Sequence, residues 1–419
     1  MNTSNKAILP IRRRLVASLA ALLLFGLFTV GGFALYNANP PVWHSFPSIG
    51  YGVHAFLWWD ETTRVRDLEF IRQMRFQYVK QIFGWKDIFP APNLPAAWTH
   101  ADVLMDEADY RGIQVIARLG KPPESAIRPA GHALEMPPFD ETAFGEFCGA
   151  VAARYKGRIK GYQVWNEPNL DREWGDRPPN AAAYVKLLAA CHTAIKRVDP
   201  AAVVITAGLA PTGTWTEQAI PDDIYLKAMY AAGAAGYYDV LGVNAPGYKS
   251  PPETAPDDPA LNGQRWQAFR HVEDIRQIMR DQGEGHKQIA ILEMGWTVDD
   301  RDTITTPTGE VIPNPYRWHA VTESEQADYL VRAYDYAGKH WRPWISLMIT
   351  IYIADISWTA ENEEYWWALT LPGYTPLVRE SFIALANSAR YINDAVTPPI
   401  GGADNPYQPL PPRPTGTPK

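Results

Sequence analysis

Two glutamates stand where buried runs of the sequence give way to loops. Glu167 lies in "GYQVWNEPNL" (161–170), and Glu293 lies in "QIAILEMGW" (288–296). Pro168 cannot donate a ladder hydrogen bond, so the first run ends there and places Glu167 at its carboxyl end. Paired carboxyls suit cleavage of a glycosidic bond: one donates a proton, and the other, ionised, attacks the anomeric carbon or supports a water molecule. Asn166, beside Glu167, is placed to hydrogen-bond a sugar hydroxyl.

Only the overall fold can bring these two glutamates together, because they are far apart in the sequence. Near-continuous apolar runs predict strands that are covered on both faces, and amphipathic segments with helical spacing alternate with them. We predict an α/β fold, one (β/α)8 barrel over residues 49–393. A doubly wound open sheet is the alternative, but it favours a Gly-rich phosphate-binding turn that this sequence lacks. The eight runs are 49–58, 77–85, 114–120, 159–168, 202–211, 238–248, 288–296 and 345–353.

The loops at the carboxyl ends of barrel strands build the active site, so residues there are candidates for substrate contact. Arg118 ends the third run and could hold Glu293 ionised, or form a structural ion pair. His54, near the end of the first run, could touch a sugar hydroxyl or be a core histidine. Trp296 and Trp366 follow the seventh and eighth runs, and each could stack on a sugar ring or simply pack. The long loop 299–319 is predicted to form one wall of the cleft.

The motifs "VWNEPN" (164–169) and "ILEMGW" (291–296) resemble those of the retaining glycoside hydrolases of clan A, the cellulase-like and β-xylosidase-like (β/α)8 enzymes. The resemblance implies that Glu167 is the acid/base at the end of strand four and that Glu293 is the nucleophile at the end of strand seven. Strand six departs from the pattern. Asn244 stands where many members have a histidine, and Tyr248, a few residues later, is the candidate to orient Glu293.

The two glutamates are expected to differ in protonation. Burial and the charge of Glu293 should raise the pKa of Glu167, whereas Glu293 should stay ionised with Arg118 and Tyr248 as hydrogen-bond donors. Two other functions would use the same fold: a catalytically silent barrel that binds glycans, and a transglycosylase in which a sugar replaces water. The intact Asn166, Glu167 and Glu293 favour an enzyme over the silent barrel.

The start of the chain predicts a membrane protein. Residues 1–14 are basic and are predicted to be cytoplasmic. Residues 15–36, "LVASLAALLLFGLFTVGGFALY", carry no charge and are long enough to span a bilayer. A transmembrane anchor is preferred to a cleaved signal peptide, because the run is long and lacks a clean cleavage site. The catalytic domain would then face outward from the cell membrane on a single span, after a linker at 37–48. The Pro/Gly-rich tail 394–419 is predicted to be disordered.

Composition limits the partners. The net charge of −7 gives no basic footprint for nucleic acid, and the 16 Trp and 21 Tyr are consistent with a carbohydrate-stacking cleft as well as with an aromatic core. Cys148 and Cys191 are the only cysteines, and two buried free thiols are preferred to a disulfide. No Cys or His spacing indicates a metal site, and no cofactor is predicted.

Overall fold

The computed structural model describes residues 41–92, 94–128, 133, 136–306 and 308–400. From His44 onward the chain forms one unit built on a closed barrel of eight parallel strands. This confirms the predicted barrel and excludes the open sheet. The strands follow one another around the barrel in the order β1-β10-β7-β6-β5-β4-β3-β2. They are β1 (Gly50–His54), β2 (Tyr78–Gly84), β3 (Gln114–Gly120), β4 (Ile159–Val164), β5 (Val204–Ile205), β6 (Val240–Asn244), β7 (Gln288–Met294) and β10 (Ile345–Thr350).

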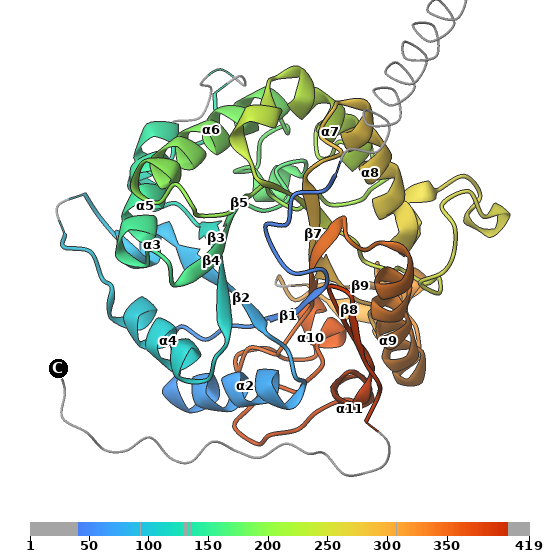
Figure 1. Cartoon of the computed structure of the whole chain (residues 1–419). Helices are drawn as coiled ribbons and strands as arrows, with labels where there is room; N and C mark the ends of the chain where they lie inside the picture. The colour runs from blue at the N-terminus through green and yellow to red at the C-terminus, as the bar shows by residue number, and fades with distance from the viewer. Residues whose placement is uncertain (1–40, 93, 129–132, 134–135, 307, 401–419) are drawn as a thin grey trace, which may run out of the picture. The chain divides into compact units, whose positions relative to one another are not determined.

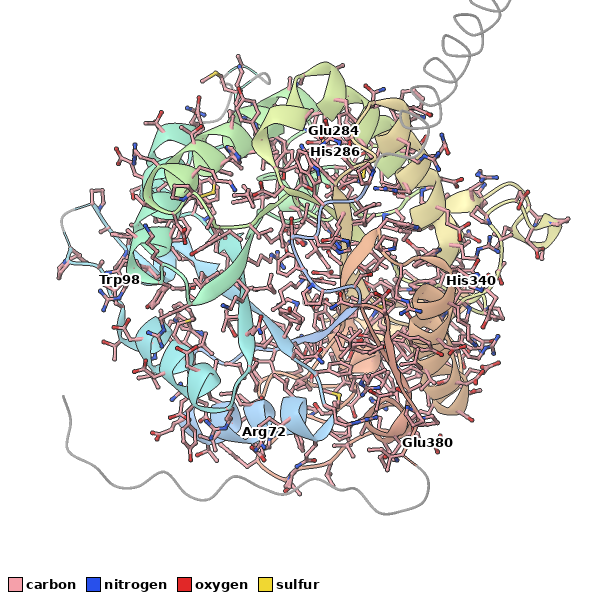
Figure 2. All side chains as sticks on the ribbon, in the orientation of Figure 1. Arg72, Trp98, Glu284, His286, His340 and Glu380 are labelled. Carbon is pink, nitrogen blue, oxygen red and sulfur yellow. A yellow bond between two sulfur atoms is a disulfide. The ribbon has the colours of Figure 1, made fainter. Side chains whose placement is uncertain are left out.

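Helices surround the strands, as Figure 1 shows. The predicted amphipathic segments form all of them except the short helices α3 and α10, and α9 starts with a capping box in which Thr322 and Glu325 exchange hydrogen bonds. Figure 2 shows Arg72, His340 and Glu380 on the outer side of this ring. The helices are α2 (Glu61–Gln73), α3 (Trp85–Ile88), α4 (Thr99–Tyr110), α5 (Glu141–Arg154), α6 (Ala181–Val198), α7 (Asp222–Ala231), α8 (Val272–Asp281), α9 (Glu323–His340), α10 (Glu363–Trp367) and α11 (Glu380–Asn387).

The amino-terminal end of the barrel is closed by Phe46, which lies in the segment predicted to be a linker. Its side chain is buried against Tyr78 on β2, with ring centroids 6.0 Å apart, and it joins the cluster of apolar side chains inside the barrel. Gln288, the first residue of β7, accepts from the Phe46 N–H at 3.1 Å and donates to its carbonyl at 3.2 Å. The end of the predicted linker is therefore part of the barrel core. Gly161 makes room for the ring, because a Cβ there would lie 2.9 Å from Phe46.

The two ends of the chain lie partly outside the described residues. Residues 1–40 lie outside the described residues, and with them the predicted cytoplasmic segment 1–14 and the predicted span 15–36; so do residues 401–419. Within the part that is described, no helix has the length and apolar character needed to cross a membrane. The predicted disordered tail begins instead with a strand, since β12 (Ala395–Thr397) pairs antiparallel with β11 (Arg390–Ile392).

Cys148 and Cys191 form a disulfide that joins α5 to α6, with their Cα atoms 5.4 Å apart. The preference for free thiols was therefore wrong. Helical spacing shows that both residues face the core, but it does not show that they face each other. Gly145 and Gly149 let the helices approach closely, because Cβ atoms there would lie 3.1 Å and 3.3 Å from atoms of Ala190 and Ala194 on α6.

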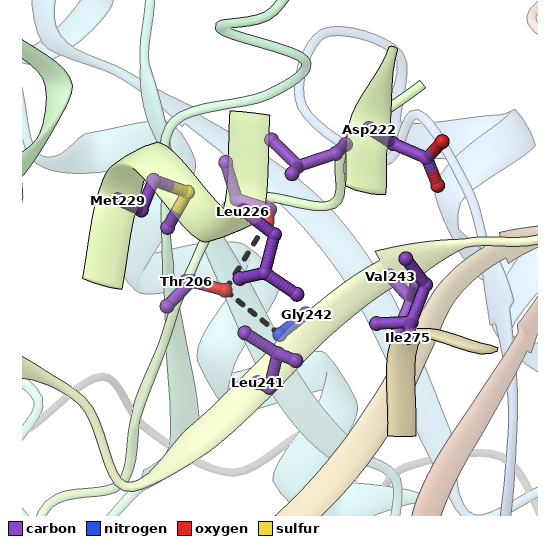
Figure 3. Close-up of a pocket in the computed structure, with 10 residues that line it drawn as sticks. Thr206, Asp222, Leu226, Met229, Leu241, Gly242, Val243 and Ile275 are labelled. Atoms are coloured by element: carbon purple, nitrogen blue, oxygen red, sulfur yellow. Dashed lines mark hydrogen bonds between the residues drawn. The ribbon is translucent and has the colours of Figure 1, made fainter. Parts of the chain in front are cut away.

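A small void remains between the barrel and its helical layer. It measures about 10 Å³, roughly the space of one water molecule. Leu226 and Met229 on α7 line it together with Leu241 on β6, as Figure 3 shows. Its lining side chains are largely apolar, so it is a packing defect on the outer side of the strands.

We expect reduction of the disulfide to lower the free energy of unfolding by about 2–4 kcal/mol, because the cross-link restricts the unfolded chain. Urea denaturation of the oxidised and reduced protein measures the difference, and the Cys148→Ser/Cys191→Ser variant should match the reduced protein. Two free thiols found by alkylation of the unfolded, unreduced protein would contradict the bond.

Phe46→Ala should lower the free energy of unfolding by about 3 kcal/mol, because it removes a buried ring and leaves a cavity at the barrel floor. Ile383→Ala is the control, since Ile383 lies on α11 with 54% of its surface exposed. Urea denaturation of both variants tests the assignment. Equal losses would show that Phe46 does not close the barrel.

Candidate active site

The chain turns sharply where β4 ends. Trp165 and Glu167 have φ angles of 72° and 39°, a left-handed conformation that costs energy for residues other than glycine. Trp165 is fixed by a hydrogen bond from its indole N–H to the carbonyl of Glu173 at 2.7 Å and by stacking on Phe139, centroid to centroid 4.5 Å. The backbone N–H of Glu167 donates to the carbonyl of Gly208 at 3.0 Å. These contacts hold the Glu167 backbone in its strained conformation.

Asn244, the last residue of β6, connects the two glutamates. Its side-chain amide donates to Oε1 of Glu167 at 2.8 Å. Its backbone is in register with Glu293 on the neighbouring strand β7, and the next N–H, of Ala245, donates to the Glu293 carbonyl at 2.8 Å. Both glutamates therefore lie on the carboxyl-terminal rim, on either side of Asn244. Gly208 cannot be larger, because its Cβ would lie 2.1 Å from Oδ1 of Asn244.

The surroundings of Glu167 favour its neutral form. Burial raises its pKa to about 7, and the charges of Glu293 and Glu173 act in the same direction. Arg172, whose guanidinium lies 3.8 Å from Oε2, and the Asn244 hydrogen bond oppose the rise without cancelling it. A carboxyl with this pKa can both donate and accept a proton near neutral pH.

Glu293 is held by a buried lysine that the sequence interpretation did not select. Lys80, on β2, has no exposed side-chain surface, and its ammonium lies 2.8 Å from Oε1 of Glu293 and 2.8 Å from the Leu292 carbonyl. Burial lowers the pKa of Lys80 to about 8, and Glu293 counteracts part of that shift. The bond between the Lys80 ammonium and the Glu293 carboxyl is charge-assisted and therefore stronger than a bond between neutral groups. The signal was present in the sequence, since Lys80 is the one charged residue in the strand YVKQIFG.

Arg118 and His54, both predicted from their positions near strand ends, lie close to this ion pair. Arg118 places a guanidinium nitrogen 3.9 Å from Oε1 of Glu293, so it adds charge without a direct hydrogen bond. His54 is buried, and both of its ring nitrogens are without a hydrogen-bond partner among the described residues. Burial lowers its pKa, as do the charges of Lys80 and Arg118, so the ring is neutral. A neutral imidazole offers one donor and one acceptor to a ligand.

Tyr248 does not orient Glu293. Its hydroxyl donates to the Pro211 carbonyl at 2.7 Å. The backbone of Tyr248 is left-handed, with a φ angle of 48°. Its ring instead stacks on Trp318, with centroids 5.5 Å apart. Trp318 belongs to the loop 299–319, which carries the hairpin of β8 (Thr303–Thr305) and β9 (Val311–Pro313).

The two tryptophans proposed for sugar stacking make contacts with other residues of the protein. Trp296 has no exposed surface, and its indole N–H donates to the Ser250 carbonyl at 2.9 Å, so its predicted contact with a sugar is wrong. Trp366, on α10, carries the Arg301 guanidinium over its ring, 4.8 Å from the centroid. The aromatic residue directly after β10 is Tyr352, whose pKa is raised by burial and by the charge of Glu293.

A cavity of about 280 Å³ adjoins the acid/base candidate. It lies where the loops that follow β3 and β4 meet. Asn166 is among its lining residues and is itself buried, with Oδ1 accepting from Gln163 at 3.3 Å. Among the described residues, no group of three or more His, Cys, Asp or Glu gathers that could hold a metal ion. The full lining is Ile82, Arg118, Leu119, Gly120, Lys121, Pro122, Ile127, Pro138, Phe139, Trp165, Asn166, Arg172, Glu173 and Gly175.

Comparisons with known proteins show the fold. No protein family matches the sequence, and no curated protein is significantly similar to it. Solved structures do match. A family 39 glycoside hydrolase from Bacteroides cellulosilyticus WH2 aligns with a TM-score of 0.56 and 17% identity over 83% of this chain and 64% of that protein. The family 1 β-glucosidase of Thermotoga maritima aligns with a TM-score of 0.56 and 12% identity, over 83% of this chain and 98% of that one.

A third structure agrees. A GH10 endoxylanase from a sugarcane soil metagenome aligns with a TM-score of 0.51 and 14% identity over 81% of this chain and 96% of that protein. This chain spans less than two thirds of the family 39 enzyme. At these identities the likeness concerns the fold, and at that level it confirms the resemblance to the clan A barrels that the two glutamate motifs predicted.

Proposed function

We propose that this protein is a retaining glycoside hydrolase, with Glu167 as acid/base and Glu293 as nucleophile. The observation that carries the proposal is the difference between the two carboxyl groups. Glu167 is partly buried, accepts a hydrogen bond from Asn244 and has a pKa of about 7, whereas Glu293 is paired with the ammonium of Lys80. A retaining hydrolase needs one carboxyl that carries a proton and one that is ionised. The barrel fold, shared with solved glycoside hydrolases, supports the same assignment.

The first step breaks the bond between the anomeric carbon and the leaving oxygen. Lys80 holds Oε1 of Glu293, and within the described part of the chain no hydrogen bond reaches Oε2. Oε2 therefore attacks the anomeric carbon, while Glu167 transfers its proton to the leaving oxygen. In the second step Glu167 removes a proton from water, the water oxygen bonds to the anomeric carbon, and Glu293 departs as a carboxylate. Two inversions leave the configuration retained.

Aromatic side chains near the rim fit a carbohydrate substrate. Trp318, 48% exposed, stacks on Tyr248 in the loop predicted to form a wall of the cleft. On the side of Glu293, Tyr352 packs at 5.3 Å from His54, centroid to centroid. Apolar sugar faces stack on such rings.

We also propose that the enzyme works outside the cytoplasm, attached to the cell membrane by residues 15–36. The uncharged length of that segment supports an anchor. The Cys148–Cys191 disulfide supports an oxidising compartment, because such bonds are rare in the cytosol.

The two glutamates should respond differently to substitution. Glu293→Ala should lose about 10⁴-fold or more in kcat on every glycoside, because no nucleophile remains. Glu167→Ala should keep a fast first step with a dinitrophenyl glycoside, which needs no proton, and then release the sugar slowly for want of a base. Added azide should accelerate Glu167→Ala and give a glycosyl azide of retained configuration, which proton NMR identifies.

The same experiment tests the roles against each other. Azide should give the inverted product with Glu293→Ala, since it then attacks from the face that Glu293 occupied. The opposite pairing of products and variants would reverse the two roles. A wild-type protein that cleaves no member of a broad glycoside panel would indicate a glycan-binding barrel, and transfer to added sugar in preference to water would indicate a transglycosylase.

The pH dependence should follow Glu167. Its pKa is raised to about 7, so the protonated acid persists up to that pH and is lost as the pH rises further. For a glycoside with a poor leaving group, kcat/KM should therefore fall above a pH of about 7. A dinitrophenyl glycoside needs no acid, so its decline should begin later, where Lys80 loses its proton at a pH of about 8. If kcat/KM of the Glu167→Gln variant still fell above a pH of about 7, the decline would belong to another titrating group.

A further inference from the structure

The cavity beside Glu167 carries an excess of positive charge. Three cationic side chains line it, Arg118, Lys121 and Arg172, against one carboxylate, that of Glu173. Arg118 comes from the end of β3, Lys121 from the loop that follows, and Arg172 from the loop after β4. Arg172 stands at the mouth, since 68% of its side chain is exposed, whereas Arg118 is only 15% exposed.

These cations are only loosely paired. Arg118 lies 3.7 Å from Glu173 and 3.9 Å from Glu293, and Arg172 lies 3.8 Å from Glu167, distances too long for hydrogen bonds. Lys121 has no carboxylate within 4.0 Å in the described part of the chain. The donors of all three side chains are therefore available to a ligand.

Stabilisation of the nucleophile does not account for this charge. Lys80 already bonds Glu293 at 2.8 Å, and Arg118 adds a second cation at 3.9 Å. Lys121 and Arg172 form no ion pair with Glu293 among the described residues, yet both line the cavity. A neutral sugar offers hydroxyl groups, for which uncharged partners suffice. A carboxylate matches the planar fork of an arginine, and bonds between charged groups are about twice as strong as neutral ones.

We propose that this cavity binds a sugar residue that carries a carboxylate, a uronic acid, next to the bond that is cleaved. Arg118 and Lys121 hold the carboxylate, and Arg172 guides it in at the mouth. The inference rests on the proposed glycoside hydrolase function and names the substrate class of the same site. Asn166, which lines the cavity beside Glu167, brings the bound ring next to the proton donor.

The test uses matched substrates. Uronic-acid-containing oligosaccharides are compared with the same oligosaccharides after chemical reduction of their carboxylates to alcohols. We expect kcat/KM to be about tenfold or more higher for the carboxylated member of a pair, the value of one charged hydrogen bond. Equal or faster cleavage of the reduced member would overturn the inference and leave the hydrolase intact.

Matched variants locate the effect. Lys121→Gln should reduce the ratio of kcat/KM between the carboxylated and reduced substrates severalfold, and Lys121→Gln/Arg172→Gln should reduce it further. Lys160→Gln removes the same charge from an exposed position at the opposite end of β4 and should leave the ratio unchanged. The proposed site would be overturned if Lys121→Gln/Arg172→Gln left this ratio of kcat/KM unchanged. It would also be overturned if Lys160→Gln lowered the ratio as much as the double variant does.

Binding separates the inference from the hydrolase proposal. In calorimetric titration of Glu167→Gln, carboxylated oligosaccharides should bind about tenfold or more tightly than their reduced forms. Tight binding without cleavage of any substrate by the wild type would refute the hydrolase and support the ligand class. Equal binding of the carboxylated and the reduced oligosaccharides would overturn the assignment of a uronic acid. Inorganic sulfate that binds as tightly as the carboxylated oligosaccharide would overturn it too, because the site would then recognise any anion.

Discussion

Lys80 is a lysine with no exposed side-chain surface, and its ammonium lies 2.8 Å from Glu293. A buried charge is costly unless a partner and hydrogen bonds replace its water, and here Glu293 and the Leu292 carbonyl replace it. Burial raises the pKa of Glu167, and the negative charge of Glu293 acts in the same direction. The Lys80–Glu293 ion pair therefore bears on both carboxyl groups to which the proposed function assigns a role.

Barrel geometry was predictable from the sequence, and so was the position of both glutamates. The eight apolar runs all became strands of the barrel, because strands covered on both faces must be apolar along their length. Glu167 and Glu293 were identifiable because each breaks such a run at its end. Closure then places them on one rim, and Asn244 connects them. No local pattern could show this connection, since it depends on the order of strands around the barrel.

Side-chain direction was the part that sequence reasoning could not supply. Tyr248 follows a strand end as predicted, but its left-handed backbone directs the hydroxyl to Pro211. Trp296 follows a strand end too, yet it is enclosed in the core. Phe46 was assigned to a linker because its neighbours are prolines and polar residues, although it fills the barrel floor from outside the strand pattern. Lys80 stands out in the sequence as the one charged residue of its strand, but its partner Glu293 is known only once the barrel is closed.

Arg118 lines the cationic cavity and also lies near Glu293. It lies between Glu293 at 3.9 Å and Glu173 at 3.7 Å and is bound tightly by neither. A side chain so placed can turn toward a bound anion at little cost, because it gives up no short hydrogen bond. An anion that draws Arg118 away leaves Lys80 as the cation in contact with Glu293. If the proposed uronic acid binds there, its carboxylate and Glu293 would share the charge of one guanidinium, that of Arg118.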